Sequence, residues 1–158
     1  MNRRRLAGLA AGAVLIPAAV SACTPDVTSA RVQTVFSTTF DRLYRMQQAE
    51  LGHHPPAPLL RLGANGRVIA QKPYSHTRCH KGAKGAAQTG AGDNWTCVEF
   101  FERPTGTIAE ADYDVAVQTD GCLIATGPSQ VVGGPQLQTQ DGRTLVNPLT
   151  QFDACFPT

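Results

Sequence analysis

Residues 28–50, TSARVQTVFSTTFDRLYRMQQAE, carry the pattern that decides the fold. Their larger apolar side chains recur mostly every three or four residues: Val32, Val35, Phe36, Phe40, Leu43 and Met46. At 100° per residue these side chains fall within an arc of about 140°, which predicts an amphipathic helix. Asp26, Thr28 and Ser29 are its candidate N-caps, and Gly52 marks its end.

Short strand-like runs follow this helix. Residues 94–101, NWTCVEFF, are rich in aromatic and β-branched side chains, which favour strands. Tyr113, Val115 and Val117 alternate with polar or small residues, as in a half-buried strand. Three hairpins are predicted by turn dipeptides that lie between apolar runs: Asn65-Gly66, Asp120-Gly121 and Asp141-Gly142.

One helix followed by hairpins predicts an α+β fold, with an N-terminal amphipathic helix packed on one face of an antiparallel sheet of about four to seven strands. The alternative is an all-β sandwich with a peripheral helix. The expected core joins Val32, Phe36, Phe40 and Leu43 of the helix to Val98, Phe100, Val115, Val117, Leu123 and Leu145 of the sheet. Residues 23–158 would form one domain, with residues 23–29 as a short tether.

The first residues have the order of an export signal. The basic residues Arg3, Arg4 and Arg5 precede an uncharged run at 6–20, LAGLAAGAVLIPAAV. That run is too short to span a bilayer core of ~30 Å, which needs about 20 helical residues, but it fits the apolar region of a signal peptide. Val20-Ser21-Ala22-Cys23 follows and resembles the lipobox of bacterial lipoprotein signal peptides.

This resemblance implies that residues 1–22 are removed and that Cys23 carries a diacylglyceryl group. The protein would then be held by lipid at the extracytoplasmic face of the cell membrane, because two acyl chains bury many CH₂ groups at ~0.8 kcal/mol each. An ordinary secretory signal cut after Ala22 is the alternative. Arg3-Arg4-Arg5-Leu6 loosely matches a twin-arginine signal, so the export route stays open. The Gly- and Ala-rich remainder resembles small lipoproteins of actinobacterial envelopes.

Signal removal changes the charge of the chain. The full sequence has 14 basic and 12 acidic side chains, a net charge of +2. Loss of Arg3, Arg4 and Arg5 leaves 11 basic side chains against 12 acidic ones, a net charge of −1. The bulk charge therefore gives no reason to expect a nucleic-acid partner, and export argues further against one.

Four cysteines remain once Cys23 is assigned to lipid: Cys79, Cys97, Cys122 and Cys155. An even number in an exported chain indicates two disulfides, and four cysteines allow three connectivities. Proximity in the sequence favours Cys79–Cys97 with Cys122–Cys155.

Metal sites are the competing interpretation of several residues. His76, Cys79 and His80 lie within five residues, but there is no CxxC and no second ligand pair at zinc-finger spacing. His53-His54 stands beside prolines, as in an exposed loop. A calcium cluster of Glu102, Glu110, Asp112 and Asp114 would lack the EF-hand spacing. No metal or cofactor is therefore expected.

Two stretches of positive charge have a functional and a plain interpretation. Arg31, Arg42 and Arg45 share one flank of the helix, where they would meet anionic lipid headgroups or simply face solvent. Residues 80–93, HKGAKGAAQTGAGD, predict a mobile loop that lacks the spacing of a phosphate-binding loop.

Motifs for catalysis are absent from the sequence. It contains no G-x-S-x-G and no H-E-x-x-H, and pairing of the thiols would remove the cysteine nucleophiles. We therefore expect no enzymatic activity but a binding or structural role, with an unidentified protein or small molecule as partner. The alternatives are an accessory subunit of an envelope ABC-type transporter and a cell-wall hydrolase. The hydrolase would use two carboxylates, either Glu99 with Glu102 or Glu110 with Asp112.

Overall fold

The computed structural model describes residues 26–53, 59–62, 68–71, 75–83 and 85–157. The lipobox, His54 and the Asn65-Gly66 turn lie outside these residues. The elements follow in the order α1 (Ser29–Glu50), β1 (Leu59–Leu62), β2 (Val68–Gln71), β3 (Ser75–Lys81), β4 (Gly92–Glu102), β5 (Ile108–Val117), β6 (Cys122–Thr126), α2 (Ser129–Val132), β7 (Gln136–Gln138), β8 (Thr144–Val146) and β9 (Gln151–Cys155).

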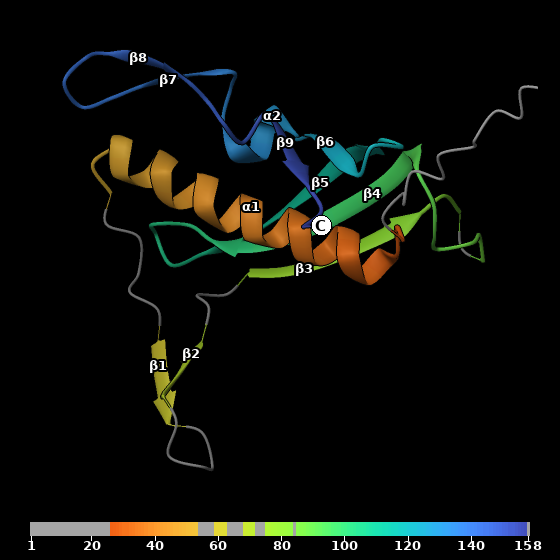
Figure 1. Cartoon of the computed structure of the whole chain (residues 1–158). Helices are drawn as coiled ribbons and strands as arrows, with labels where there is room; N and C mark the ends of the chain where they lie inside the picture. Colours follow the sequence, from red (N-terminus) through yellow and green to blue (C-terminus); the bar gives the residue numbers. More distant parts are fainter. Residues whose placement is uncertain (1–25, 54–58, 63–67, 72–74, 84, 158) are drawn as a thin grey trace, which may run out of the picture.

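Five strands form one antiparallel sheet in the order β3-β4-β5-β6-β9, and α1 crosses one of its faces (Figure 1). The α+β class is confirmed, and the all-β sandwich is wrong. β1 with β2 and β7 with β8 form separate hairpins. The predicted turns at Asp120-Gly121 and Asp141-Gly142 join β5 to β6 and β7 to β8.

The helix begins and ends close to where its sequence indicates. Thr28 is the N-cap, and its hydroxyl accepts a hydrogen bond from the backbone N–H of Arg31 at 3.4 Å. Gly52, just after the helix, has a φ of +74°, a conformation that glycine adopts without strain. Met46 is 51% exposed, whereas Gln47 and Gln48 are buried. The apolar stripe therefore gives way to a buried polar turn after Leu43.

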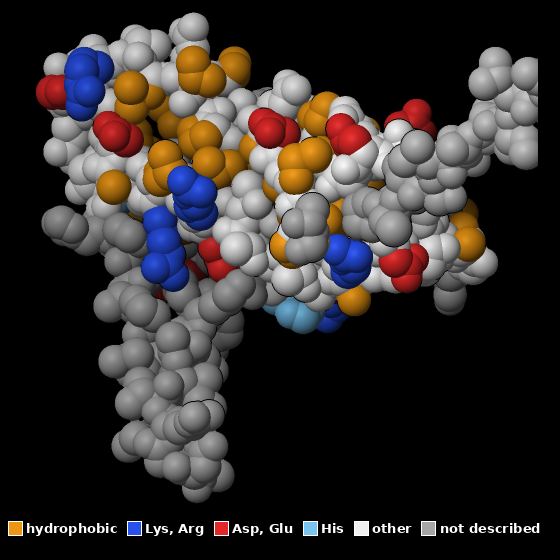
Figure 2. Space-filling view, viewed as in Figure 1, with side chains coloured by type: hydrophobic (Ala, Val, Ile, Leu, Met, Phe, Trp, Pro, Cys, Tyr) orange, Lys and Arg blue, Asp and Glu red, His pale blue; other side chains and the backbone are white. Residues whose placement is uncertain are grey.

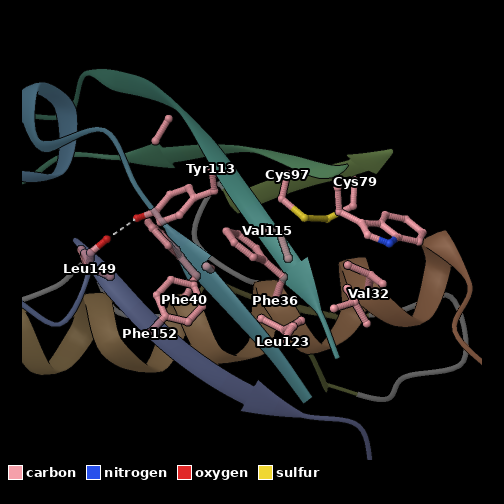
Figure 3. Packing of buried hydrophobic residues seen from close by; sticks show 14 of the residues in the cluster. Val32, Phe36, Phe40, Cys79, Cys97, Tyr113, Val115, Leu123, Leu149 and Phe152 are labelled. Carbon is pink, nitrogen blue, oxygen red and sulfur yellow. Dashed lines mark hydrogen bonds between the residues drawn. A yellow bond between two sulfur atoms is a disulfide. The ribbon is translucent and has the colours of Figure 1, made fainter. Parts of the chain in front are cut away.

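Aromatic rings fill the space between α1 and the sheet (Figure 3). The Phe36 ring lies 5.0 Å from Tyr113 and 5.3 Å from Phe152, measured between centroids. The Phe40 ring lies 5.3 Å from Phe101. The predicted core residues Val32, Phe36, Phe40, Val115, Val117 and Leu123 are all buried there.

Three predicted core residues lie elsewhere. On β4, Trp95, Cys97, Glu99 and Phe101 are buried on the α1 side, so Val98 and Phe100 belong to the opposite face and are only half-buried. The prediction placed these two on the wrong face because a charged residue in the middle of the strand, Glu99, points inward. Leu145 is half-buried in the separate β7–β8 hairpin, away from the core cluster.

Both preferred disulfides are confirmed. Cys79 is bonded to Cys97 and Cys122 to Cys155, and in each case the two residues are direct partners on adjacent antiparallel strands. Cys79 and Cys97 are buried under α1. Cys122 and Cys155 lie on the other face of the sheet, where Cys122 is half-buried and Cys155 is exposed.

Candidate functional site

The face of the sheet that α1 leaves uncovered carries an ordered pattern of side chains, which we call the open face. On β3 its residues are His76, Arg78 and His80; on β4, Thr96, Val98 and Phe100; on β5, Glu110, Asp112 and Asp114. The β3 and β5 residues are exposed, and the β4 residues are half-buried. A basic column and an acidic column thus flank a mainly apolar one.

Strand register aligns the three columns into rows. His76 is the partner of Phe100, which is the partner of Glu110; Arg78, Val98 and Asp112 form the next row. His80, Thr96 and Asp114 form the third row. Because neighbouring strands are about 4.8 Å apart, the basic and acidic columns lie about 10 Å apart across β4.

The opposite charges of the open face do not neutralise each other within the chain. Among the described residues, the ion pairs join Arg143 to Glu50 and to Asp141, away from this face. Arg78 Nε instead donates to His76 Nε2 at 3.0 Å, within its own column. Both columns therefore stay available to a complementary surface.

The residues considered for a metal site or a hydrolase are separated by the same alternation of side chains. Cys79 is bonded to Cys97 on the α1 side, while His76 and His80 lie on the open face. Glu102, Glu110, Asp112 and Asp114 share the open face, yet within the described residues no three His, Cys, Asp or Glu side chains are grouped for a metal.

The carboxylate pair Glu99 and Glu102 is wrong for a hydrolase, because the two side chains point to opposite faces of β4. Glu99 is fully buried, and its Oε2 accepts a hydrogen bond from the Thr77 hydroxyl. Glu110 and Asp112 do share a face, as neighbours along the exposed acidic column.

A groove of about 240 Å³ opens at the far end of α1, among Tyr44, Leu51, His53, Arg103 and Leu137. It is smaller than the roughly 300–1,000 Å³ of typical small-molecule pockets. Two hollows near the start of the helix, of about 480 and 640 Å³, share Ala91, Gln118 and Thr119. All three spaces are open to solvent.

A chain of hydrogen bonds forms the polar side of the groove at the far end of α1. Asn147 Nδ2 donates to the carbonyls of residues 132, 133 and 134, so its Oδ1 accepts, at 2.8 Å, from Gln47 Nε2. Gln47 Oε1 then accepts from Gln48 Nε2, and Gln48 Oε1 is left to accept from His53 Nδ1 at 2.8 Å. The backbone carbonyls that accept from Asn147 thus fix which side chain donates and which accepts in each of these hydrogen bonds. The bonds tie α1 to the segment after α2.

Several cations singled out in the sequence are held by backbone carbonyls. Lys81 Nζ donates to the carbonyls of Thr89, Gly90 and Ala91 at 2.8–3.1 Å. These hydrogen bonds hold together the two ends of the loop between β3 and β4. Arg31 donates to the carbonyls of Asp26 and Pro157. Arg42 and Arg45 remain exposed on α1. Figure 2 shows Lys and Arg side chains beside hydrophobic ones on the side of the molecule that is viewed in Figure 1.

Half-buried Tyr44 and buried Tyr113 predict a loss of stability in alkali. Burial raises the pKa of Tyr44 to about 12 although the charge of Arg103 acts to lower it; burial and then Glu99 raise the pKa of Tyr113 further. Their stabilisation is complete below the unfolded pKa of about 10 and is lost as pH rises toward the folded values. The urea midpoint should therefore be level from pH 7 to 9 and fall above about pH 10.

The matched variants are Tyr44→Phe and Tyr113→Phe, which cannot ionise at these positions. Tyr44 donates to the Glu102 carbonyl and Tyr113 to the Leu149 carbonyl, so each variant starts from a lower stability. Each should nevertheless show a shallower alkaline fall than the natural chain. An identical slope in all three proteins would contradict this assignment.

Comparison of the chain with protein-family models, curated protein sequences and solved structures found no match. Neither α1 nor α2 combines the length and the apolar content that a membrane-crossing helix needs. The open face is an ordered surface that the fold itself leaves unused, and sequence reasoning named most of its residues without placing them side by side.

Proposed function

We propose that this chain is an exported lipoprotein, anchored through Cys23 at the extracytoplasmic face of the cell membrane, whose domain binds a protein partner and catalyses no reaction. The lipobox-like residues 20–23 support the anchor. The two disulfides support an oxidising compartment outside the cytoplasm, where such bonds persist.

The observation that carries the binding role is the alignment of charged columns on the open face. Arg78 and Asp112 stand exposed on either side of half-buried Val98 in one row. A partner that fits this face is flat, with an apolar strip between one acidic and one basic stripe. Such complementarity sets the orientation and choice of a protein partner more than it raises affinity.

The anchor is tested by mass spectrometry of the N-terminal peptide from the native, membrane-extracted protein. We expect a peptide that begins at Cys23 and carries the mass of a diacylglyceryl group. A Cys23→Ser variant should leave the membrane fraction, because the acyl chains supply the attachment. An unmodified cysteine at the start of the mature protein would contradict the anchor.

The binding face is tested by photo-crosslinking in intact membranes, with p-benzoylphenylalanine placed at Phe100. The matched control carries the same probe at Thr38, which is exposed on α1. We expect a protein adduct from position 100 that Arg78→Glu abolishes, and none from position 38. Equal adducts from both positions, or none from position 100, would contradict the proposal.

A further inference from the structure

We infer that the partner of the open face is a second copy of this chain, related to the first by a two-fold axis that runs parallel to β4 above its middle. This inference rests on the proposed function, because it names the occupant of the same face. It follows from the symmetry of the charge pattern, which makes the face complementary to itself.

A two-fold axis along β4 exchanges what lies on either side of that strand. It places the basic column of β3 over the acidic column of β5 in the second copy, and each residue keeps its row. Arg78 then faces Asp112 of the second copy, His76 faces Glu110 and His80 faces Asp114. The β4 column meets itself, so Phe100 packs against Phe100 and Val98 against Val98, while Glu102 at the end of the strand meets its own copy and opposes the contact there. This is an isologous contact, the usual kind in homodimers.

The other two-fold axis in the plane of the face is excluded by charge. An axis perpendicular to the strands would place β3 over β3 and β5 over β5, so that Glu110, Asp112 and Asp114 would meet carboxylates only. Like charges brought together at an interface cost several kcal/mol. The column pattern therefore selects one orientation of the second copy.

The position of the anchor selects the same axis independently. The N–H of Gly90 donates to the Val27 carbonyl, and the Gly90 carbonyl accepts from the Trp95 indole. The chain therefore enters α1 beside the start of β4. An axis parallel to β4 keeps this end of both copies on the same side, so two lipid anchors can enter one membrane. The perpendicular axis would send them in opposite directions.

The contact is of a size that suits a weak dimer within a membrane. Packed sheets lie about 10 Å apart with strands within about 30° of each other, a gap that arginine and aspartate side chains cross from opposite sides. Three strands give a width of only about 15 Å, which places the buried area at the low end of specific interfaces. Confinement of both copies to one surface raises their effective concentration and offsets this limit.

The test exchanges the signs of one row in the full-length, membrane-attached protein. Two differently tagged copies are co-expressed, one of them with p-benzoylphenylalanine at Phe100, and the adduct that carries both tags is quantified after irradiation. The variants are Arg78→Glu and Asp112→Arg, because these two residues share the middle row. The control is Arg45→Glu, the same change of charge on exposed α1.

When both copies carry Arg78→Glu, or both carry Asp112→Arg, we expect the two-tag adduct to fall about tenfold or more, because both contacts of the middle row then bring like charges together. One Arg78→Glu copy with one Asp112→Arg copy should restore it, since the two introduced side chains then face each other and the two natural ones do the same. Two copies that each carry both changes should restore it as well. Arg45→Glu should leave it unchanged. Thermal unfolding of each variant checks that the fold is kept.

The outcomes separate this inference from the proposed function. Failure of the mixed pair to recover, with all variants folded, would overturn the two-fold arrangement. An Arg78-dependent adduct with a different protein and none between tags would overturn the second copy while supporting the open face as a binding surface. No adduct of any kind at position 100 would overturn both.

Discussion

Gly127→Ala should lower the free energy of unfolding by about 3 kcal/mol or more, although it adds a single methyl group. A Cβ at this position would lie 2.5 Å from Cε1 and 2.7 Å from Cζ of Tyr113, and 2.9 Å from the Leu149 carbonyl oxygen. Carbon atoms do not approach so closely. Either the ring or the turn before β9 that carries the carbonyl must therefore move.

Neither neighbour of Gly127 can move without further loss. The Tyr113 side chain is fully buried, and its ring lies 5.0 Å from Phe36 and 5.7 Å from Phe152. Its hydroxyl donates to the same Leu149 carbonyl at 2.9 Å, so relief of the clash also breaks a buried hydrogen bond. Overpacking costs about 1–3 kcal/mol, and an unsatisfied buried group adds a similar amount.

The matched control for this prediction is Gly134→Ala. A Cβ there would meet nothing closer than the Gln136 carbonyl oxygen at 3.9 Å, and neither glycine has a positive φ. The control should change stability by less than about 1 kcal/mol, as alanine in place of an unstrained glycine usually does. Urea denaturation with the disulfides intact measures both. Equal midpoints for the two variants would show that the ring is free to shift.

Removal of the Cys122–Cys155 disulfide, as Cys122→Ser with Cys155→Ser, should cost about 3–4 kcal/mol, as predicted by the chain-entropy model for a separation of 33 residues. The Cys79–Cys97 disulfide closes 18 residues and should contribute slightly less by the same effect, to which the packing of buried Cys97 adds. Loss of both would remove most of a typical stability of about 5–15 kcal/mol.

Exposure predicts the order in which the two bonds are reduced. Cys155 is exposed, whereas Cys79 is 7% exposed and Cys97 is 0% exposed beneath α1. Under native conditions a thiol reductant should open Cys122–Cys155 first, and Cys79–Cys97 only as the chain unfolds. Timed alkylation with peptide mapping follows both. Reduction of the two bonds at equal rates would contradict the burial described for the inner one.

Local signals accounted for the features that depend on neighbours in the chain. The periodicity of residues 28–50 predicted α1, and two Asp-Gly turns predicted their hairpins. Proximity alone favoured the correct pairing of the cysteines. Each of these depends on chain geometry over short distances, where a sequence pattern carries most of the information.

Features that depend on strand register could not be predicted. On β4 both faces carry aromatic or aliphatic side chains, and the inner face also holds the charged Glu99, so the sequence of the strand does not show which face is inner. The rows of the open face need the pairing of β3, β4 and β5, which no single segment specifies. Asn147 was missed for the same reason, because its main partner, Gln47, lies 100 residues away.

The two disulfides have a further consequence through their places in the sheet. One fastens β3 to β4 and the other fastens β9 to β6, and β3 and β9 are the outermost strands. Outermost strands are the ones that proteins exchange with neighbours or that template aggregation. In this sheet each outermost strand is covalently bonded to its neighbour. Neither outermost strand can therefore leave its sheet and pair with another copy while its disulfide is intact.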